Sequence, residues 1–218
     1  MKIKAIVFDF DGVITDSKSL KRDAWRAVFS DRNSNDNELL QKEVGIGKGN
    51  RYEILRRTLL SSIGVPETEL DRLVNYYADR YNELVQTGIK TKGLFLGVVQ
   101  MFGRLSKKYP LYINTATPDI AIQITLEEFG LKNFFHGVFG SLSGSKEENL
   151  RQVITELNVK PFDILMVGDE AKDKEAAEKV GTRFIGIADS INKWTPRNFP
   201  HPLLKETALL EGFLERNL

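Results

Sequence analysis

The sequence has no cysteine, little net charge and no long hydrophobic run. The absence of cysteine excludes a disulfide framework and thiolate metal sites, and it fits a reducing compartment. A formal net charge of +1 is too small for the broad electrostatic attraction that nucleic-acid or anionic-membrane binding requires. No apolar stretch is long enough to span a bilayer. We therefore expect a cytoplasmic protein with neither nucleic acid nor membrane among its partners.

The chain does have enough residues for a sizeable core. Its 218 residues, 41% of them hydrophobic and 28% charged, are ordinary for a globular protein with one large domain or one domain plus an insertion. The apolar run at the N-terminus stops at Asp9, which makes it too short for a signal peptide. This run is typical of a buried strand.

Short apolar runs recur along the chain, separated by helical patterns. The runs cover residues 3–8, 111–114, 138–139, 164–167 and 183–187. Apolar residues three or four positions apart, as in 94–105 and 150–157, indicate amphipathic helices between them. This alternation predicts βαβ units and therefore an α/β fold with a doubly wound parallel sheet. Residues 202–218 have the pattern of one amphipathic helix.

Residues 17–87 break this rhythm, because they contain helical patterns and no convincing strand. The polar residues 31–37 are predicted to connect two of the helices. We expect an all-helical cap over residues 17–87, inserted into an α/β catalytic core that consists of residues 1–16 and 88–218.

Polar side chains follow several of the predicted strands. Asp9, Thr115 and Asp169 fall at the carboxyl ends of strands, and Lys146 begins the helix after the third strand. Ligands of open α/β sheets bind at this edge, so we expect the four side chains to converge there. Each of these residues taken alone is also compatible with a role as a helix cap.

The acids come in close pairs. Asp9 and Asp11 flank one residue, so both can face one site, one as an ionised nucleophile and the other as a proton carrier. Asp169 and Asp173 offer hard carboxylate oxygens at a spacing that suits Mg²⁺. An Asp-Gly turn and an acid-rich helix N-terminus are the plainer interpretations of these pairs.

The remaining candidates are suited to binding phosphate oxygens. Gly12 permits a tight turn and offers its backbone N–H. Thr115 offers a hydroxyl beside the N–H of Ala116, and Lys146 supplies a compact positive charge. Lys146 taken alone has the pattern of a solvated lysine in the first turn of a helix. Together, these residues and the acids predict a Mg²⁺-dependent phosphohydrolase.

The predicted cap contains a glycine-rich segment, residues 45–51. Its glycines permit close backbone approach, and Lys48 and Arg51 are candidates for contact with an anionic substrate. It is not a P-loop, because no Gly-Lys-Ser/Thr sequence occurs and no strand precedes it. The segment is either a specificity loop or a turn between helices with solvated charges.

The motifs, in this order, resemble the haloacid dehalogenase-like hydrolase superfamily over nearly the whole chain. Residues 9–16 match the first family motif closely, residues 113–115 the second and residues 168–173 the fourth. Lys146 stands for the third motif, which is little more than a lysine. The helical insertion is similar to the cap of the branch that includes phosphoglycolate phosphatases and β-phosphoglucomutases.

The resemblance implies roles for individual residues. Asp9 would form an aspartyl-phosphate, while Asp11 would protonate the leaving oxygen and then activate water. Mg²⁺ would be held by the Asp9 carboxylate, the Asp11 carbonyl and Asp169, with Asp173 bound directly or through water. The substrate would be a small phosphorylated metabolite. An acid at position 11 argues against dehalogenase chemistry, because the dehalogenases of the family carry none there.

Two other functions stay open. A sugar phosphomutase of the β-phosphoglucomutase type is one, because residues 18–25 and 45–51 resemble cap segments of those enzymes. However, Lys21 stands where they place a cap histidine, and His136 and His201 both lie outside the predicted cap. The other is a catalytically idle binding protein, which the loss of a site residue would favour; none is lost. The oligomeric state is not readable from the sequence.

Overall fold

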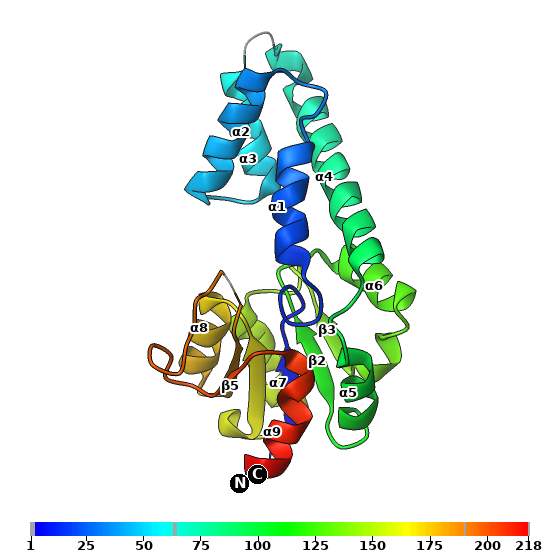
Figure 1. The fold of residues 1–218 in the computed structure, drawn as a ribbon, viewed down its shortest axis with the longest axis vertical. Coiled ribbons are helices and arrows are strands. Elements are labelled where there is room, and N and C mark those ends of the chain that lie inside the picture. Colours follow the sequence, from blue (N-terminus) through cyan, green and yellow to red (C-terminus); the bar gives the residue numbers. More distant parts are fainter. Residues whose placement is uncertain (1–2, 63–64, 190, 218) are drawn as a thin grey trace. The chain divides into compact units, whose positions relative to one another are not determined.

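The computed structural model describes residues 3–62, 65–189 and 191–217. The chain divides into two compact units (Figure 1). The core unit comprises Met1–Asp16 and Gly93–Leu218, and the helical unit comprises Ser17–Lys92. The predicted boundary at residue 87 falls inside a helix that continues to Lys92. The assignment of the two units as catalytic core and cap stays a prediction.

The core unit is built around a six-stranded sheet. Its strands are β1 (Ala5–Phe8), β2 (Leu111–Asn114), β3 (Gly137–Phe139), β4 (Ile164–Gly168), β5 (Arg183–Ile187) and β6 (Leu203–Leu204). They are arranged in the order β3-β2-β1-β4-β5-β6, and all neighbours are parallel. The predicted α/β fold with a parallel sheet is confirmed. Because β2 and β4 flank β1, the residues that follow these three strands emerge side by side at one edge.

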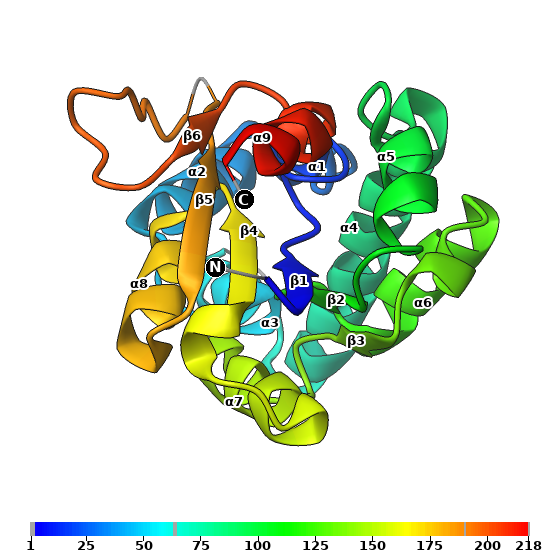
Figure 2. The same cartoon turned by 90° about the horizontal axis from the view of Figure 1, so that it is seen from below.

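Helices cover both faces of this sheet (Figure 2). They are α5 (Val98–Leu105), α6 (Asp119–Glu128), α7 (Lys146–Leu157), α8 (Ala171–Val180) and α9 (Leu210–Asn217). Side chains of β1 alternate between two apolar layers, with Ile6 and Phe8 facing α5, α6 and α9 and Ala5 and Val7 facing α7 and α8. All four side chains are fully buried, so β1 is a hydrophobic run without a polar face.

The chain leaves the core unit after β1 and returns before α5, and hydrogen bonds join these two crossings. The Phe95 N–H donates to the Ile14 carbonyl at 2.9 Å, and the Thr15 hydroxyl donates to the Gly93 carbonyl at 2.9 Å. Thr15 is completely buried. The exit and re-entry points are therefore fixed against each other by the core unit itself.

The C-terminal segment differs from the predicted single helix over residues 202–218. Leu203 and Leu204 form β6 and pair with Gly186 and Ile187 of β5, and α9 begins only at Leu210. Residues 203–204 form a strand because the backbone groups at the edge of β5 would otherwise lack a strand partner on that side. The two adjacent leucines then pack on opposite faces of the sheet, which a helical pattern does not reveal.

The helical unit contains α1 (Ser17–Ala27), α2 (Ser34–Ile46), α3 (Arg51–Ser61) and α4 (Leu70–Lys92). Its core includes aromatic pairs, with ring centroids 4.3 Å apart for Trp25 and Tyr81 and 4.5 Å apart for Phe29 and Tyr77. The prediction of a polar connector over 31–37 was wrong in its second half, because α2 begins at Ser34. Within the described ranges, no helix is both long and apolar enough to cross a membrane. A cytoplasmic location stays a prediction.

Candidate active site

The loop after β1 places two buried aspartates at the sheet edge. The Asp9 N–H donates to the Val167 carbonyl of β4 at 2.9 Å, which continues the sheet by one residue. Its side-chain Oδ1 accepts the Phe10 N–H at 2.7 Å. Asp9 is 3% exposed and Asp11 is 8% exposed. Because both carboxyl groups are held away from bulk water, their charges act strongly on their neighbours.

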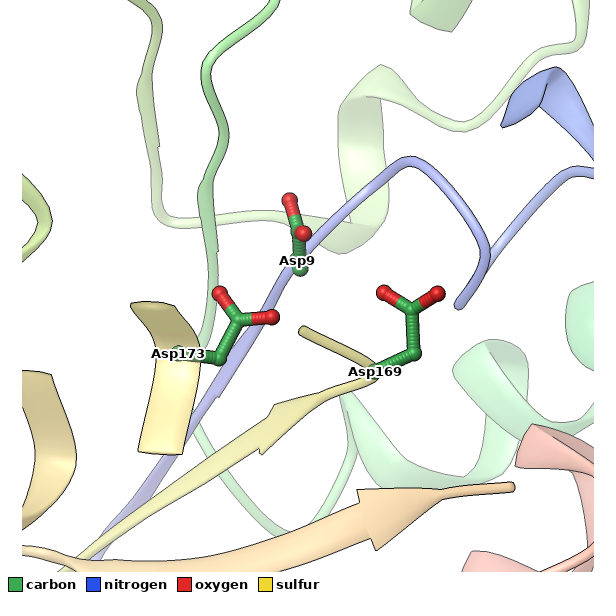
Figure 3. Close-up of side chains that lie close together, drawn as sticks. All are labelled: Asp9, Asp169 and Asp173. Atoms are coloured by element: carbon green, nitrogen blue, oxygen red, sulfur yellow. The ribbon is translucent and has the colours of Figure 1, made fainter. Parts of the chain in front are cut away.

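Asp9 gathers with two further acids, as Figure 3 shows. Asp169 directly follows β4, Asp173 lies in the first turn of α8, and both are fully buried. One carboxylate oxygen from each of the three acids lies within 4.8 Å of the others. The Asp173 Oδ2 also accepts the Glu170 N–H at 3.0 Å, which holds its carboxylate in place at the start of α8.

Lys146 is the cation of this cluster. It is the first residue of α7, and its Nζ lies 2.9 Å from Asp9 Oδ2 and also contacts Asp173 Oδ1. Burial by itself lowers the pKa of the Lys146 ammonium, but the attraction of Asp9 and Asp173 outweighs burial and raises it above its usual range. Lys146 is therefore charged at neutral pH and binds two of the predicted site acids.

Burial raises the pKa of Asp9 from 3.8 to about 7. Lys146 opposes this shift, while the negative charges of Asp173 and Asp11 add to it. In the absence of further positive charge, the site therefore has more carboxylates than its one ammonium can neutralise. Three oxygen donors of this kind, with an excess of negative charge, fit a hard divalent cation such as Mg²⁺.

The loop after β2 approaches the site from the other side of β1. The Thr115 N–H donates to the Phe139 carbonyl at 2.9 Å, and the Thr115 Oγ1 accepts the Thr117 N–H at 3.1 Å. Thr115 is buried and Ala116 is exposed. Both line a hollow of about 310 Å³ together with Lys146. The structure therefore brings Asp9, Thr115 and Lys146 to one edge of the sheet.

Thr117 is a site residue that the sequence interpretation missed. Its hydroxyl donates to Asp11 Oδ2 at 2.8 Å, and it is 9% exposed. Thr117 lies in the bend after β2, and its partner Asp11 is 106 positions away in the sequence, so no local pattern marks it as a site residue.

Two glycines leave room for the carboxylates. Gly12 has φ +79°, and a Cβ built on it would collide with the Asp169 carboxylate. A Cβ built on Gly168 would collide with Asp173 in the same way. The Gly12 N–H donates to the Thr15 carbonyl at 2.8 Å, so in this structure it is used within its own loop. Its predicted contact with phosphate stays a prediction.

A buried amide pair supports the start of α7. The Asn114 Nδ2 donates to the Lys146 carbonyl at 2.9 Å, and the Asn149 Nδ2 donates to the Asn114 Oδ1 at 3.0 Å. Ser145 caps the same helix by accepting the Glu148 N–H, while the Glu148 carboxylate accepts the Ser145 N–H. These contacts fix the backbone from which the Lys146 side chain extends.

Lys48 and Arg51 lie in the helical unit. The segment 45–51 is not one loop, because Gly45 and Ile46 end α2 and Arg51 begins α3. The Lys48 carbonyl accepts the Arg57 Nη2 at 2.6 Å, and the Arg51 guanidinium lies 5.7 Å from the Tyr81 ring centroid. Contact of Lys48 and Arg51 with a substrate stays a prediction.

Comparisons with known proteins show the family of the chain. The haloacid dehalogenase-like hydrolase model matches residues 3–181. A phosphoglycolate phosphatase of Vibrio vulnificus is 26% identical over 208 residues, covering 92% of this chain and 90% of the relative. A phosphoglycolate phosphatase of Psychrobacter arcticus is 26% identical over 202 residues, covering 88% of this chain and 86% of the relative.

Solved structures share the fold at lower identity. A putative β-phosphoglucomutase of Thermotoga maritima has a TM-score of 0.76 at 20% identity, covering 99% of this chain and 100% of the other. A magnesium-bound putative hydrolase of Bacillus subtilis has a TM-score of 0.73 at 18% identity, covering 100% of both chains. The chain therefore belongs to the haloacid dehalogenase-like hydrolase family and is a phosphatase of that family.

Proposed function

We propose that this phosphatase is Mg²⁺-dependent and hydrolyses a small phosphorylated metabolite through an aspartyl-phosphate on Asp9. The observation that carries the proposal is the position of Asp9. Its carboxylate meets Lys146 at 2.9 Å and lies in a cluster with Asp169 and Asp173, while Asp11 lies two residues away in the same loop. A nucleophile, a proton carrier and charges to hold a phosphoryl group are thus present together.

The metal would be held by the chain's own oxygen donors. These are the carboxylates of Asp9, Asp169 and Asp173 and the backbone carbonyl of Asp11. When bound, Mg²⁺ supplies positive charge that offsets the charges of the phosphoryl oxygens and of the carboxylates. The excess of buried carboxylates over Lys146 supports this part of the proposal. The fold relative of Bacillus subtilis, which binds magnesium, supports it too.

The two steps can be assigned to two aspartates. In the first, an Asp9 carboxylate oxygen bonds to phosphorus as the bond from phosphorus to the leaving oxygen breaks, and the Asp11 carboxyl gives its proton to that oxygen. In the second, Asp11 takes a proton from water as the water oxygen bonds to phosphorus. The Asp9–phosphorus bond then breaks, which releases inorganic phosphate and restores both residues.

Lys146 and the loop after β2 would hold the phosphoryl group. Lys146 is charged and lies against Asp9, so its ammonium is close to the place where the transferred oxygens gather. The Thr115 hydroxyl can donate to one of those oxygens while its Oγ1 still accepts the Thr117 N–H. Thr115 and Lys146 also line a hollow of about 310 Å³ beside the site.

The curated relatives favour 2-phosphoglycolate as the first compound to test. Release of inorganic phosphate should be measured on a panel of phosphorylated metabolites, including 2-phosphoglycolate and hexose phosphates, with MgCl₂ and with EDTA. We expect Asp9→Asn and EDTA each to abolish release. Asp163→Asn is the matched control, because Asp163 comes directly before β4, at the opposite end of that strand from Asp169.

The outcomes separate the proposal from its alternatives. Phosphate release that persists in Asp9→Asn would contradict the aspartyl-phosphate. No release from any compound, together with a trapped phosphoenzyme, would favour a phosphomutase. No release and no phosphoenzyme would favour an idle binding protein.

A further inference from the structure

The Thr117 hydroxyl donates a hydrogen bond to the Asp11 carboxylate and so connects Asp11 to the loop after β2. It lies 2.8 Å from Asp11 Oδ2, and the two residues come from loops that follow different strands. Asp11 is 106 positions away in the sequence, so this is a tertiary contact and not part of a local turn. Both residues are largely buried, which limits the water available to replace the hydrogen bond.

Thr117 is itself held from several directions. Its N–H donates to Thr115 Oγ1 at 3.1 Å, and its carbonyl accepts the Ser141 N–H at 3.0 Å. Pro118 follows it, and the proline ring restricts the backbone of the residue before it. The hydroxyl is therefore presented to Asp11 from a backbone that has little freedom to move. A fixed donor of this kind selects one orientation of the carboxyl group it binds.

We propose that Thr117 is a positioning residue that keeps the Asp11 carboxyl aimed at the oxygen atoms whose protons it carries. The inference rests on the proposed function, in which Asp11 acts first as an acid and then as a base. A hydroxyl suits both states, because it can donate to Asp11 Oδ2 whether or not the other carboxyl oxygen carries a proton. Thr117 thus holds Asp11 through both steps without taking a proton itself. An ammonium at this position could only donate, and its charge would favour the ionised form of Asp11 over the protonated one.

The role predicts a loss that depends on the leaving group. A poor leaving group, such as the alcohol of 2-phosphoglycolate, needs a proton from Asp11 as its bond to phosphorus breaks, whereas 2,4-dinitrophenolate departs without one. Thr117→Val keeps the shape of the side chain and removes the hydroxyl. Because a positioned acid contributes roughly 10²–10⁴-fold, we expect kcat/KM for 2-phosphoglycolate to fall by about 10–100-fold. For 2,4-dinitrophenyl phosphate we expect less than about a threefold fall.

The comparison should use kcat/KM, because it includes only the steps up to departure of the leaving group. Later hydrolysis of the phosphoenzyme is common to both substrates and would hide the difference in kcat. If 2-phosphoglycolate is not turned over, the best alkyl phosphate of the panel takes its place. Thr117→Ser restores a hydroxyl and should recover most of the loss. Asp11→Asn removes the acid altogether. It therefore sets the upper limit for the difference between the falls in kcat/KM on the two substrates.

Controls distinguish positioning from stability. Thr125→Val makes the same change at a buried threonine of α6 whose hydroxyl donates to the Ala121 carbonyl, and it should leave the substrate ratio unchanged. Thermal melts of each variant test folding, and Thr117→Ala provides a smaller hydroxyl-free variant if the valine does not fit. Mg²⁺ affinity from calorimetry should match the wild type, because the Thr117 hydroxyl binds the side chain of Asp11, whereas the proposed metal ligand in Asp11 is its backbone carbonyl.

Three results would overturn the inference. Equal falls on both substrates in Thr117→Val and Thr117→Ala would assign Thr117 a general structural role, while the proposed function would stand. Unchanged kcat/KM for the alkyl phosphate would show that Asp11 needs no such donor. Failure of the wild-type protein to turn over either substrate would instead refute the proposed function and the inference with it.

Discussion

Replacement of Asp9 by asparagine should stabilise the metal-free protein while abolishing its proposed activity. Asp9 is nearly completely buried, and burial together with the charges of Asp173 and Asp11 raises its pKa to about 7, despite the opposing attraction of Lys146. The folded protein therefore binds a proton at the Asp9 carboxylate more tightly than the unfolded chain does. Asparagine has nearly the shape of the protonated carboxyl and carries no charge to desolvate.

The size of the effect follows from linkage. A pKa of 3.8 in the unfolded chain and about 7 in the folded protein corresponds to about 4 kcal/mol of unfolding free energy. Because the folded-state pKa is the higher one, the wild type keeps this stability below pH 3.8 and loses it as the pH rises to about 7. We expect the variant to be no more stable at the acidic limit and more stable by up to about 4 kcal/mol at pH 8.

Urea unfolding in EDTA, repeated at several pH values, measures the difference. Trp194 packs on Phe199 in the core unit, with ring centroids 4.2 Å apart, so its fluorescence reports on that unit. Trp25 lies in the helical unit and should be replaced by phenylalanine in both proteins to remove its signal. Adding MgCl₂ should reduce or reverse the difference in unfolding free energy between Asp9→Asn and the wild type. A ligand that binds the folded state stabilises it by mass action, and the wild type keeps the Asp9 carboxylate as a proposed Mg²⁺ ligand.

A stability difference that does not change with pH, or a variant that is less stable at pH 8, would refute this reasoning. The first result would mean that attraction to Lys146 balances the desolvation of Asp9, and the second that attraction outweighs it.

Two further changes test other parts of the site. Gly12→Ala should weaken Mg²⁺ binding at least about tenfold in calorimetry and destabilise the protein by roughly 1–2 kcal/mol or more, because the new Cβ collides with Asp169 and the backbone is left-handed. Gly130→Ala is its control, since Gly130 has φ +65° and nothing within 4 Å of the added Cβ; equal loss of Mg²⁺ binding in both variants would contradict the role of Gly12. We predict that Lys48 contacts the part of the metabolite beyond its phosphate. Lys48→Ala should therefore raise KM for the metabolite substrate more than for a small aryl phosphate. Steady-state kinetics on both substrates measure the two KM values, with Lys42→Ala as the control at another exposed lysine. Equal changes in KM for both substrates would refute the predicted contact of Lys48.

The sheet and the residues at its edge were predictable because buried parallel strands leave a strong local signal. Ile6 and Phe8 lie on one face of β1 and Val7 on the other, so both faces are apolar, and the apolar run ends at an acid. The order of such strands in an α/β fold then places the residues that follow them together. The convergence of Asp9 with Asp169 and Lys146 needed only this rule.

The parts that could not be predicted depend on contacts distant in the sequence. Helix α2 begins with the polar residues 34–37, which were predicted to belong to a connector, and Leu40 is the one apolar residue of α2 that is buried. Strand β6 is two residues long and exists because the edge of β5 binds it. The Thr117 contact with Asp11 requires the fold of two loops at once. None of these features has a periodicity that a local reading detects.

The hydrogen bonds from Phe95 to Ile14 and from Thr15 to Gly93 have a consequence for the modularity of the chain. They close the core unit on itself at the place where residues 17–92 are inserted, so the ends of the insertion are already adjacent. Joining ends that lie this close demands little loop-closure entropy, and that entropy grows only slowly with the length of the connection. A few glycine and serine residues could therefore replace the whole helical unit. We therefore expect the core unit to fold with a different or shorter segment inserted between residues 16 and 93.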